Sequence, residues 1–177
     1  MSRIALVDTD QLPEAMRQIH DSADGAWGIQ HTARAFAHHP DLLQAYLGFF
    51  WPWHTGEAPG AKVDPRTKEL CRLRIAELNG CKTCASYRYQ PMLIQESEAV
   101  SAMAGDGQPL TESERVAVAY AEMLAVDHHS IGDAEVAKVR EHFDEAQLLE
   151  LTMMIGQYIG FGRTLATLQL ETVSCPI

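Results

Sequence analysis

The amino-acid sequence predicts an all-α protein, and three observations support this prediction. Apolar residues recur at helical spacing in nearly every periodic segment, as Leu43, Leu47 and Phe50 do on one face. No segment shows the alternation of apolar and polar residues that marks a half-buried strand. Prolines and short polar side chains stand before several periodic segments, where such residues start or cap helices.

The first half of the chain contains four expected helices. They cover residues 13–23, residues 29–37, the segment PDLLQAYLGFFWPW from Pro40, and residues 65–78. Pro52 and the run TGEAPG are expected to end the third helix, because proline disrupts a helix interior. Asp64 provides an N-cap for the fourth helix. The pair Asn79-Gly80 is expected to end it, because glycine readily adopts the left-handed conformation of a helix stop.

The second half continues the helical pattern. We expect one helix from Cys81 or Lys82 that Pro91 breaks or kinks, and further helices over residues 96–103, 112–126, 134–143 and 145–170. Thr111 and Glu114 form a capping box, and Asp133 and Asp144 cap the last two helices. The last helix contains three glycines that indicate close packing against a neighbour, namely Gly156, Gly160 and Gly162.

Length and composition limit the protein class. A chain of 177 residues without a linker or clear repeat is expected to form one domain over residues 1–177, and 46% apolar residues argue against disorder. The net charge of −10, without a run of lysine or arginine, argues against a nucleic-acid partner. The N-terminus lacks a signal-peptide core, and no stretch approaches the ~18 apolar residues of a membrane span. We therefore expect a cytoplasmic protein without a membrane partner.

The strongest local motif is Cys81-Lys82-Thr83-Cys84, which follows Gly80. Cys81 is expected at or near the N-cap of a new helix and Cys84 in its first turn, so the two sulfurs are within reach of a disulfide. The free N–H groups and the dipole at a helix start stabilise a thiolate. The motif therefore predicts a reactive dithiol, although two small core residues would fit the same pattern.

Zinc is an alternative use of the cysteine pair. A structural zinc site needs two further ligands, and the chain has no second CxxC or suitably spaced Cys/His pair. His128 and His129 are adjacent and would point in different directions on a helix. We therefore expect no metal and no cofactor.

Glu69 is the second candidate residue. On a helix over residues 65–78, Glu69 shares a stripe with Leu73 and Ala76, which is an apolar setting for a carboxylate. Burial would raise the pKa of the Glu69 carboxyl toward the range useful for proton transfer. Without further information, the residues favour the alternative, which is a surface glutamate paired with Arg72 or Arg66.

The run KELCRLRIAELNGCKTCASYR places Glu69 twelve residues before Cys81. This run resembles the core of the alkylhydroperoxidase D-like (AhpD-like), or carboxymuconolactone decarboxylase, superfamily. The resemblance extends over residues 30 to 170. It implies an AhpD-like helical bundle that assembles as a homo-oligomer, often a trimer or hexamer. In the redox branch of the superfamily, a CxxC dithiol works with a glutamate and a histidine that relay protons.

The resemblance also implies roles for individual residues. Cys84 matches the thiol that attacks peroxide, Cys81 matches the resolving thiol, and Glu69 matches the relay carboxylate. The relay histidine would stand four residues after Cys84, where this chain has Arg88. An arginine cannot shuttle protons at neutral pH, but its fixed charge can hold Cys84 as a thiolate or pair with Glu69. Tyr87 and Tyr89 flank Arg88, and either hydroxyl can donate a hydrogen bond.

Other candidates are weaker. His54 ends an unusually aromatic segment that includes Phe49, Phe50, Trp51 and Trp53, which we expect in the core, at a subunit interface or beside a substrate. His54 is the histidine to test as a substitute proton carrier. Cys71 faces away from Glu69 and is expected to be a buried thiol. Cys175 is two residues before Ile177 and is expected to have no role.

Three functions fit these observations. The leading hypothesis is a thiol-dependent peroxidase that reduces hydroperoxides through Cys84 and Cys81 and is regenerated by a protein or small-molecule dithiol. The second is a carboxymuconolactone decarboxylase-like lyase, in which Arg88, Arg72 or His54 binds a small carboxylated substrate. The third is a non-enzymatic helical scaffold or redox-sensing oligomer whose disulfide changes its packing.

Overall fold

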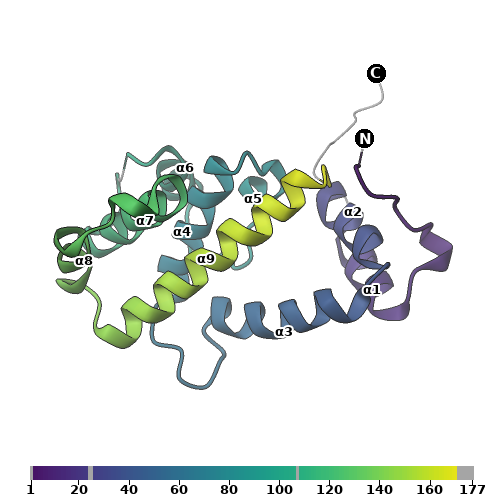
Figure 1. The fold of residues 1–177 in the computed structure, drawn as a ribbon, viewed down its shortest axis with the longest axis horizontal. Coiled ribbons are helices and arrows are strands. Elements are labelled where there is room, and N and C mark those ends of the chain that lie inside the picture. The colour runs from purple at the N-terminus through teal and green to yellow at the C-terminus, as the bar shows by residue number, and fades with distance from the viewer. Residues whose placement is uncertain (1, 24–25, 107, 171–177) are drawn as a thin grey trace.

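The computed structural model describes residues 2–23, 26–106 and 108–170 (Figure 1). Its α-helices are α1 (Glu14–Ser22), α2 (Trp27–Phe36), α3 (Pro40–Thr55), α4 (Pro65–Leu78), α5 (Lys82–Ser86), α6 (Glu96–Ala104), α7 (Glu112–Val126), α8 (Asp133–Arg140) and α9 (Glu145–Thr167). Two short 3-10 helices are η1 (Thr9–Gln11) and η2 (His128–Ser130). The described residues contain no strand, so the all-α prediction is confirmed. None of the helices within these ranges is both long enough and apolar enough to cross a lipid bilayer.

Helix α4 is the centre of the bundle. It packs against α6, α7 and α9, and α9 crosses in front of it in the view of Figure 1. Helix α4 places Leu70, Leu73 and Ile75 in the largest apolar cluster, with at most 1% of each residue exposed. The same helix carries Glu69, so the central position of α4 places the Glu69 carboxylate in the interior.

Charged residues on α4 are also tied to neighbouring helices. Lys68 is fully buried, and its Nζ lies 2.9 Å from Oε1 of Glu150 on α9. Arg66 pairs with Glu98 on α6 at 2.8 Å and with Glu114 on α7 at 2.6 Å. Because a buried charge without a partner is costly, these pairs fix the position of α4 among the helices that it contacts.

Helix α3 is longer than predicted. Pro52 does not end α3, which continues to Thr55 and stops, as predicted, in the run TGEAPG, at Gly56 in the left-handed conformation (φ 79°). Proline removes one backbone N–H donor from a helix. Pro52 stands in the last turn of α3, so the helix loses a single backbone hydrogen bond there and can continue to Thr55. The continuation carries His54 into the interior, where it is fully buried.

Most predicted helix starts are confirmed, and one is wrong. The side chains of Asp64, Thr111 and Asp144 cap α4, α7 and α9 by accepting backbone N–H groups. Helix α8, in contrast, begins at Asp133 and has Gly132 as its N-cap. The side chain of Glu135 accepts the N–H of Gly132, so this helix start is stabilised from inside the helix.

The glycines of α9 do not share one role. A Cβ on Gly162 would come within 2.5 Å of Nδ2 of Asn79, so α9 and the end of α4 are in close contact there. A Cβ on Gly156 or Gly160 would meet no atom within 4 Å. The prediction of close packing is therefore confirmed for Gly162 and wrong for the other two, which lie on the exposed face of the helix.

Candidate active site

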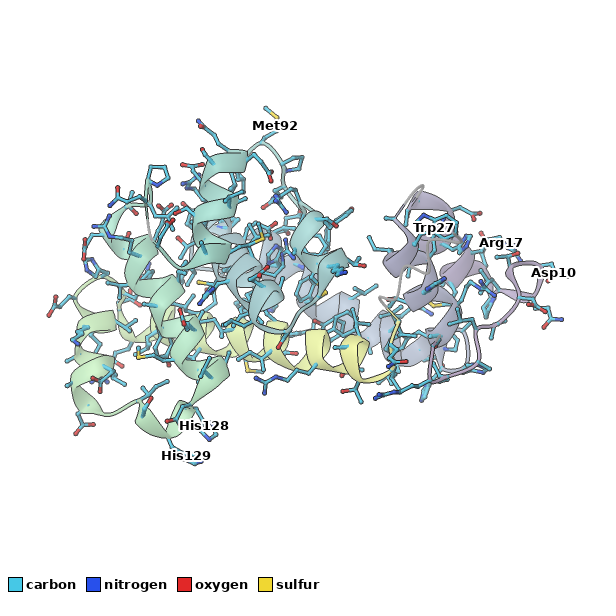
Figure 2. The ribbon with its side chains drawn as sticks, turned by 90° about the horizontal axis from the view of Figure 1, so that it is seen from above. Asp10, Arg17, Trp27, Met92, His128 and His129 are labelled. Atoms are coloured by element: carbon cyan, nitrogen blue, oxygen red, sulfur yellow. A yellow bond between two sulfur atoms is a disulfide. The ribbon has the colours of Figure 1, made fainter. Side chains whose placement is uncertain are left out.

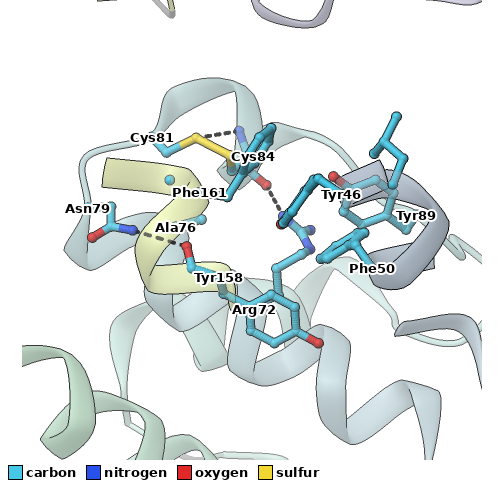
Figure 3. A pocket seen from close by; sticks show the side chains of 12 residues that line it. Tyr46, Phe50, Arg72, Ala76, Asn79, Cys81, Cys84, Tyr89, Tyr158 and Phe161 are labelled. Atoms are coloured by element: carbon cyan, nitrogen blue, oxygen red, sulfur yellow. Dashed lines mark hydrogen bonds between the residues drawn. A yellow bond between two sulfur atoms is a disulfide. The ribbon is translucent and has the colours of Figure 1, made fainter. Parts of the chain in front are cut away.

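The cysteine pair lies where α4 ends and α5 begins. Gly80 has a φ of 65°, which lets the chain turn sharply after Asn79. Cys81 is the N-cap of α5, and its Sγ accepts the N–H of Cys84 at 3.1 Å. The two cysteines form a disulfide across a Cα–Cα distance of 5.3 Å (Figure 3). The predicted position of both residues at a helix start is confirmed.

Helix α5 is held in place by α2. Gly28 faces Thr83 so closely that a Cβ at position 28 would lie 1.8 Å from the Thr83 Oγ1. Helix α5 ends at Ser86, earlier than the break at Pro91 that we expected, and Tyr87 leaves it in an extended conformation. The cysteine pair therefore stands on a short helix that contacts both α2 and α4.

A small cavity lies beside the disulfide (Figure 3). It has a volume of about 40 Å³ and is lined by Tyr46, Leu47, Phe50, Arg72, Ala76, Asn79, Cys81, Cys84, Tyr89, Tyr158, Phe161 and Gly162. Most of this wall is aromatic or aliphatic, and Arg72 contributes the charge. Cys81 is 1% exposed and Cys84 is half-buried, so Cys84 is the more accessible of the two.

Arg72 connects the cysteine pair to Glu69. Its Nε and Nη2 donate to the two carboxylate oxygens of Glu69 at 2.6 and 2.7 Å. Its Nη1 donates to the Cys84 carbonyl at 2.6 Å, and Nη2 also donates to the Tyr87 carbonyl at 2.8 Å. In Figure 3 the guanidinium extends between the disulfide and the aromatic side chains. Arg72 is 4% exposed, so a permanent positive charge is buried in the cavity wall.

Glu69 is buried, with 1% exposed, so the surface position is wrong, whereas its pairing with Arg72 is confirmed. Its pKa moves in the direction opposite to the one expected from burial. Burial by itself raises the pKa of the Glu69 carboxyl. The two hydrogen bonds from Arg72, together with the closeness of the His54 ring nitrogen, outweigh burial and hold this pKa at about 2. The expectation of a raised pKa is therefore wrong, because Glu69 is both buried and paired with Arg72, whereas the sequence treated burial and pairing as alternatives. Glu69 is ionised at neutral pH.

His54 lies on the other side of Glu69. Its Nε2 is 3.1 Å from Oε2 of Glu69, but the two atoms are not aligned for a hydrogen bond. Its Nδ1 is 2.9 Å from the hydroxyl of Tyr158. Burial lowers the pKa of His54 and outweighs the attraction of Glu69, so the ring is neutral at pH 7. Burial also raises the pKa of Tyr158 well above its ordinary value, so the phenol keeps its proton and can donate it to Nδ1.

Comparisons with known proteins show which fold these helices form. No family model matches the chain. The crystal structure of an uncharacterized peroxidase-related protein from Ralstonia eutropha JMP134, described as an alkylhydroperoxidase AhpD core, is 18% identical and has a TM-score of 0.69, covering 98% of this chain and 93% of that one. An uncharacterized peroxidase-related protein from Silicibacter sp. TM1040 is 17% identical and has a TM-score of 0.72, covering 95% and 90%. This chain has the AhpD-like fold.

A curated relative supports the same comparison at the level of sequence. The uncharacterized protein YnjA of Escherichia coli (strain K12) is 32% identical over 119 residues, which are 65% of this chain and 62% of that protein. The chain therefore spans less than two thirds of the length of the relative that it matches.

The remaining predicted site residues occupy different places in the AhpD-like fold. The side chain of Tyr87 is 39% exposed, and its ring contacts Tyr89 edge to face at 5.1 Å. Arg88 donates to the Ala85 carbonyl and pairs with Glu96 on α6 at 3.1 Å. Arg88 is not among the residues that line the cavity, and its catalytic role stays a prediction.

Sequence reasoning missed Tyr158 and gave Arg72 and Tyr89 other roles in this site. Arg72 was considered only as a partner of Glu69 or as a ligand for a carboxylated substrate, although its spacing of three residues from Glu69 puts both on one helix face. Tyr158 is 104 residues from His54, so no local pattern connects them. Tyr89 lies under the Arg72 guanidinium, 4.8 Å from its ring centroid, in a cation–π contact.

The other cysteines and the histidines give no metal centre in the part of the chain that is described. No group of three or more His, Cys, Asp or Glu side chains in these ranges is placed to hold a metal ion. Cys71 is a fully buried free thiol, as predicted, and burial raises its pKa. Cys175 lies outside the described residues. The site therefore offers a dithiol pair, a buried cation, an ionised acid and a neutral histidine for chemistry.

Proposed function

We propose that this protein is a thiol-dependent peroxidase that reduces hydroperoxides through a dithiol–disulfide cycle of Cys84 and Cys81. The observation that carries the proposal is the disulfide itself, which closes at the start of α5 beside a cavity that contains a buried guanidinium. Structural disulfides fasten distant parts of a chain, whereas this one joins cysteines three residues apart. A pair of this kind is suited to opening and closing.

The first step is attack by the Cys84 thiolate on the peroxide. Arg72 lines the cavity with Cys84 and keeps its positive charge, which favours the thiolate over the thiol. The sulfur bonds to the terminal peroxide oxygen, the O–O bond breaks, and the leaving alkoxide or hydroxide takes a proton from water. Cys84 becomes a sulfenic acid, and the substrate leaves as an alcohol or water.

The second step closes the disulfide. Cys81 is buried, and its Sγ is held against the N–H of Cys84, so it is placed to attack the sulfenic sulfur. An S–S bond forms, and the sulfenic oxygen leaves as water with the Cys81 proton. A dithiol donor then exchanges with the disulfide, returns both thiols and becomes a disulfide itself. The cytoplasm supplies such donors, and we propose that the protein works there as a homo-oligomer.

The lyase hypothesis has less support from the site. A carboxylated substrate needs a cation with free hydrogen-bond donors, but Arg72 is already bound to Glu69 through both carboxylate oxygens. The peroxidase proposal, in contrast, needs only the charge of Arg72, which remains while Arg72 is paired with Glu69.

A thiol titration tests the proposal. The reduced protein has four cysteines, and one equivalent of hydroperoxide should remove the two thiols of Cys81 and Cys84. Cys84→Ser should stop the reaction with peroxide. Cys81→Ser should still react once, keep a sulfenic acid at Cys84 and fail to turn over. Cys71→Ala is the control, because this buried thiol should not affect the cycle.

Each alternative gives a different result in the same experiment. Full peroxide turnover by Cys84→Ser would overturn the assignment of the attacking thiol. Loss of two thiols without turnover in the presence of a dithiol donor would support the redox sensor. Unchanged thiol counts would contradict both redox hypotheses and leave the lyase to be tested with a muconolactone-type acid.

A further inference from the structure

Helix α9 has an exposed face on which every residue is apolar. Its exposed positions from residue 146 to residue 160, called the α9 face below, are Ala146, Leu149, Met153, Gly156 and Gly160. Leu149 is 73% exposed and Met153 is 52% exposed. In Figure 1 this helix lies at the front of the bundle, and no other described helix crosses over it. An exposed helix face without polar residues is typical of a surface that another protein covers.

Helix α3 extends this apolar surface on one side of α9. Phe49 and Trp53 of α3 form a groove with Leu149 and Met153 of α9. Phe49 is 36% exposed, and its ring centroid lies 6.5 Å from that of Trp53. The exposed apolar surface therefore spans two helices, which distinguishes it from single apolar side chains scattered over a surface.

Gly156 and Gly160 leave two depressions on the α9 face. Within the chain, a Cβ at either position would meet no atom within 4 Å, so internal packing does not require glycine there. Glycine in a helix interior also destabilises the helix relative to alanine. A second helix that packs closely on α9 gives these glycines a physical reason, because its side chains would occupy the two depressions.

Large and small residues of the α9 face match each other when two copies of the helix run antiparallel. If a two-fold axis lies midway between Met153 and Gly156, Met153 of each copy faces Gly156 of the other. In the same register, Leu149 of each copy faces Gly160 of the other. Large side chains then fill the positions where the facing helix has none, as in other closely packed helix pairs.

Charges at the two ends of α9 favour the same arrangement. Glu145 stands at the N-terminal end with a side chain that is 76% exposed, and the exposed Arg163 stands near the C-terminal end. The register above puts Glu145 of one copy one residue from the position opposite Arg163 of the other, and the two-fold axis repeats this pair. Among the described residues, Arg163 uses two of its five N–H groups on Asn79 and Ala125. Glu145 pairs with Arg140 of its own chain at 3.0 Å, and a carboxylate can accept from a second donor.

From this geometry we propose that the α9 face binds a second copy of this chain, with the two α9 helices antiparallel about a two-fold axis. A two-fold interface uses the same patch on both copies, so the patch must match itself in shape and charge. A parallel pair would place Leu149 on Leu149 and Glu145 on Glu145, which matches neither. The proposal names an interface for the homo-oligomer proposed above, and it does not depend on the peroxidase activity.

Cross-linking between two cysteine variants tests the antiparallel register. Leu149→Cys and Gly160→Cys are each made in a Cys175→Ser background, with the Cys81–Cys84 disulfide kept closed. When the two variants are co-expressed and treated with copper phenanthroline, they should form a disulfide-linked dimer. Either variant alone should not, because its two added thiols would lie about 16 Å apart along the helices, beyond the reach of a disulfide.

The size of the assembly tests the same face by a second measurement. Sedimentation velocity of the unaltered protein should show an even number of chains. Gly156→Leu and Gly160→Leu should each weaken this association at least tenfold, because each leucine fills a position that the facing side chain needs. Both variants should stay folded by circular dichroism, since a Cβ at either position meets no atom of its own chain within 4 Å. Gly48→Leu is the matched control at an exposed position of α3 outside the groove, and it should leave the association unchanged.

The remaining outcomes each overturn this interface. A monomer would overturn the homo-oligomer as well, and an odd number of chains would exclude the two-fold pairing. Cross-links in Leu149→Cys alone would show that the helices pair in a parallel register. An assembly that withstands both leucine substitutions would show that the copies meet elsewhere. None of these measurements uses the reaction of Cys84 with peroxide, so the peroxidase function stands or falls by its own test.

Discussion

Arg72 gives the site a positive charge that the sequence motif alone assigned to Arg88. Arg72 is buried against Glu69 and reaches the backbone of the cysteine helix, whereas Arg88 pairs with Glu96, a residue whose side chain is 74% exposed. Electrostatic effects on a thiol are larger in a buried, weakly screened setting than near solvent. Arg72 should therefore control the reactivity of Cys84 more than Arg88 does.

Replacing each arginine by lysine distinguishes their roles. Arg72→Lys keeps a charge near Glu69 but loses the two-pronged pairing and the bond to the Cys84 carbonyl. We expect about a tenfold slower reaction of Cys84 with hydrogen peroxide, and a thiol pKa about one unit higher, measured as the pH dependence of alkylation by iodoacetamide. Arg88→Lys should change the rate less than about twofold. If Arg88→Lys slows the reaction of Cys84 with hydrogen peroxide more than Arg72→Lys does, Arg88 rather than Arg72 controls the reactivity of Cys84.

The candidate residues illustrate which contacts a sequence can predict. Cys81 and Cys84 are close in the chain, so their meeting at a helix start follows from local spacing alone. The burial of Glu69 follows from the apolar stripe on its helix, but its pKa depends on hydrogen-bond geometry that a stripe does not describe. The contact of His54 with Tyr158 depends on how α3 and α9 cross, which no local pattern contains.

At the scale of helices, the position of the cysteine pair depends on how α2 meets α5. Helix α5 has only five residues, and so few hydrogen bonds of its own that tertiary packing must stabilise it. Gly28 provides the space for that packing, because Thr83 lies where a side chain at position 28 would begin. A larger residue at position 28 would displace α5 and the cysteines with it.

Gly28→Ala therefore tests the contact between α2 and α5. We expect it to lower the free energy of unfolding by about 1–3 kcal/mol, as overpacking usually does, and to slow the reaction of Cys84 with peroxide. Gly48→Ala is the matched control within α3, where a Cβ meets no atom within 4 Å. It should raise the free energy of unfolding by about 0.5–1 kcal/mol, because alanine favours the helix. Urea unfolding of both variants measures the difference, and equal effects would show that α5 is not held by this contact.

Helix ends were predicted well where a side-chain cap exists and poorly where tertiary contacts decide. Asp64, Thr111 and Asp144 cap helices in the way that their sequences indicate. Pro52 is a strong local stop signal, yet α3 continues past it because the following turn places His54 in the buried network. Local propensity is overridden where a side chain gains burial and a hydrogen-bond partner.

For the whole molecule, the buried network makes folding stability depend on pH. The pKa of Glu69 in the folded state is about 2, compared with an ordinary value of 4.5, because Arg72 and His54 stabilise its charge against burial. Between these values the unfolded chain binds a proton that the folded chain does not, so stability is lost as the pH falls from about 4.5 to 2. The pKa of His54 is also lowered in the folded state, from an ordinary value of 6.5, so a first loss begins below about pH 6.5.

We therefore expect the free energy of unfolding, measured by urea at a series of pH values, to fall in two stages on acidification. Glu69 should account for about 3 kcal/mol between about pH 5 and 2, and Glu69→Gln should lose this part of the slope. His54→Gln should remove the stage that begins below about pH 6.5, because glutamine has no proton to gain. His128→Gln is the control, since His128 is exposed on η2 at the surface of the molecule (Figure 2). If the free energy of unfolding depends on pH in the same way for His54→Gln and for the unaltered protein, burial does not hold His54 neutral. The histidine then plays no part in the pH dependence of stability.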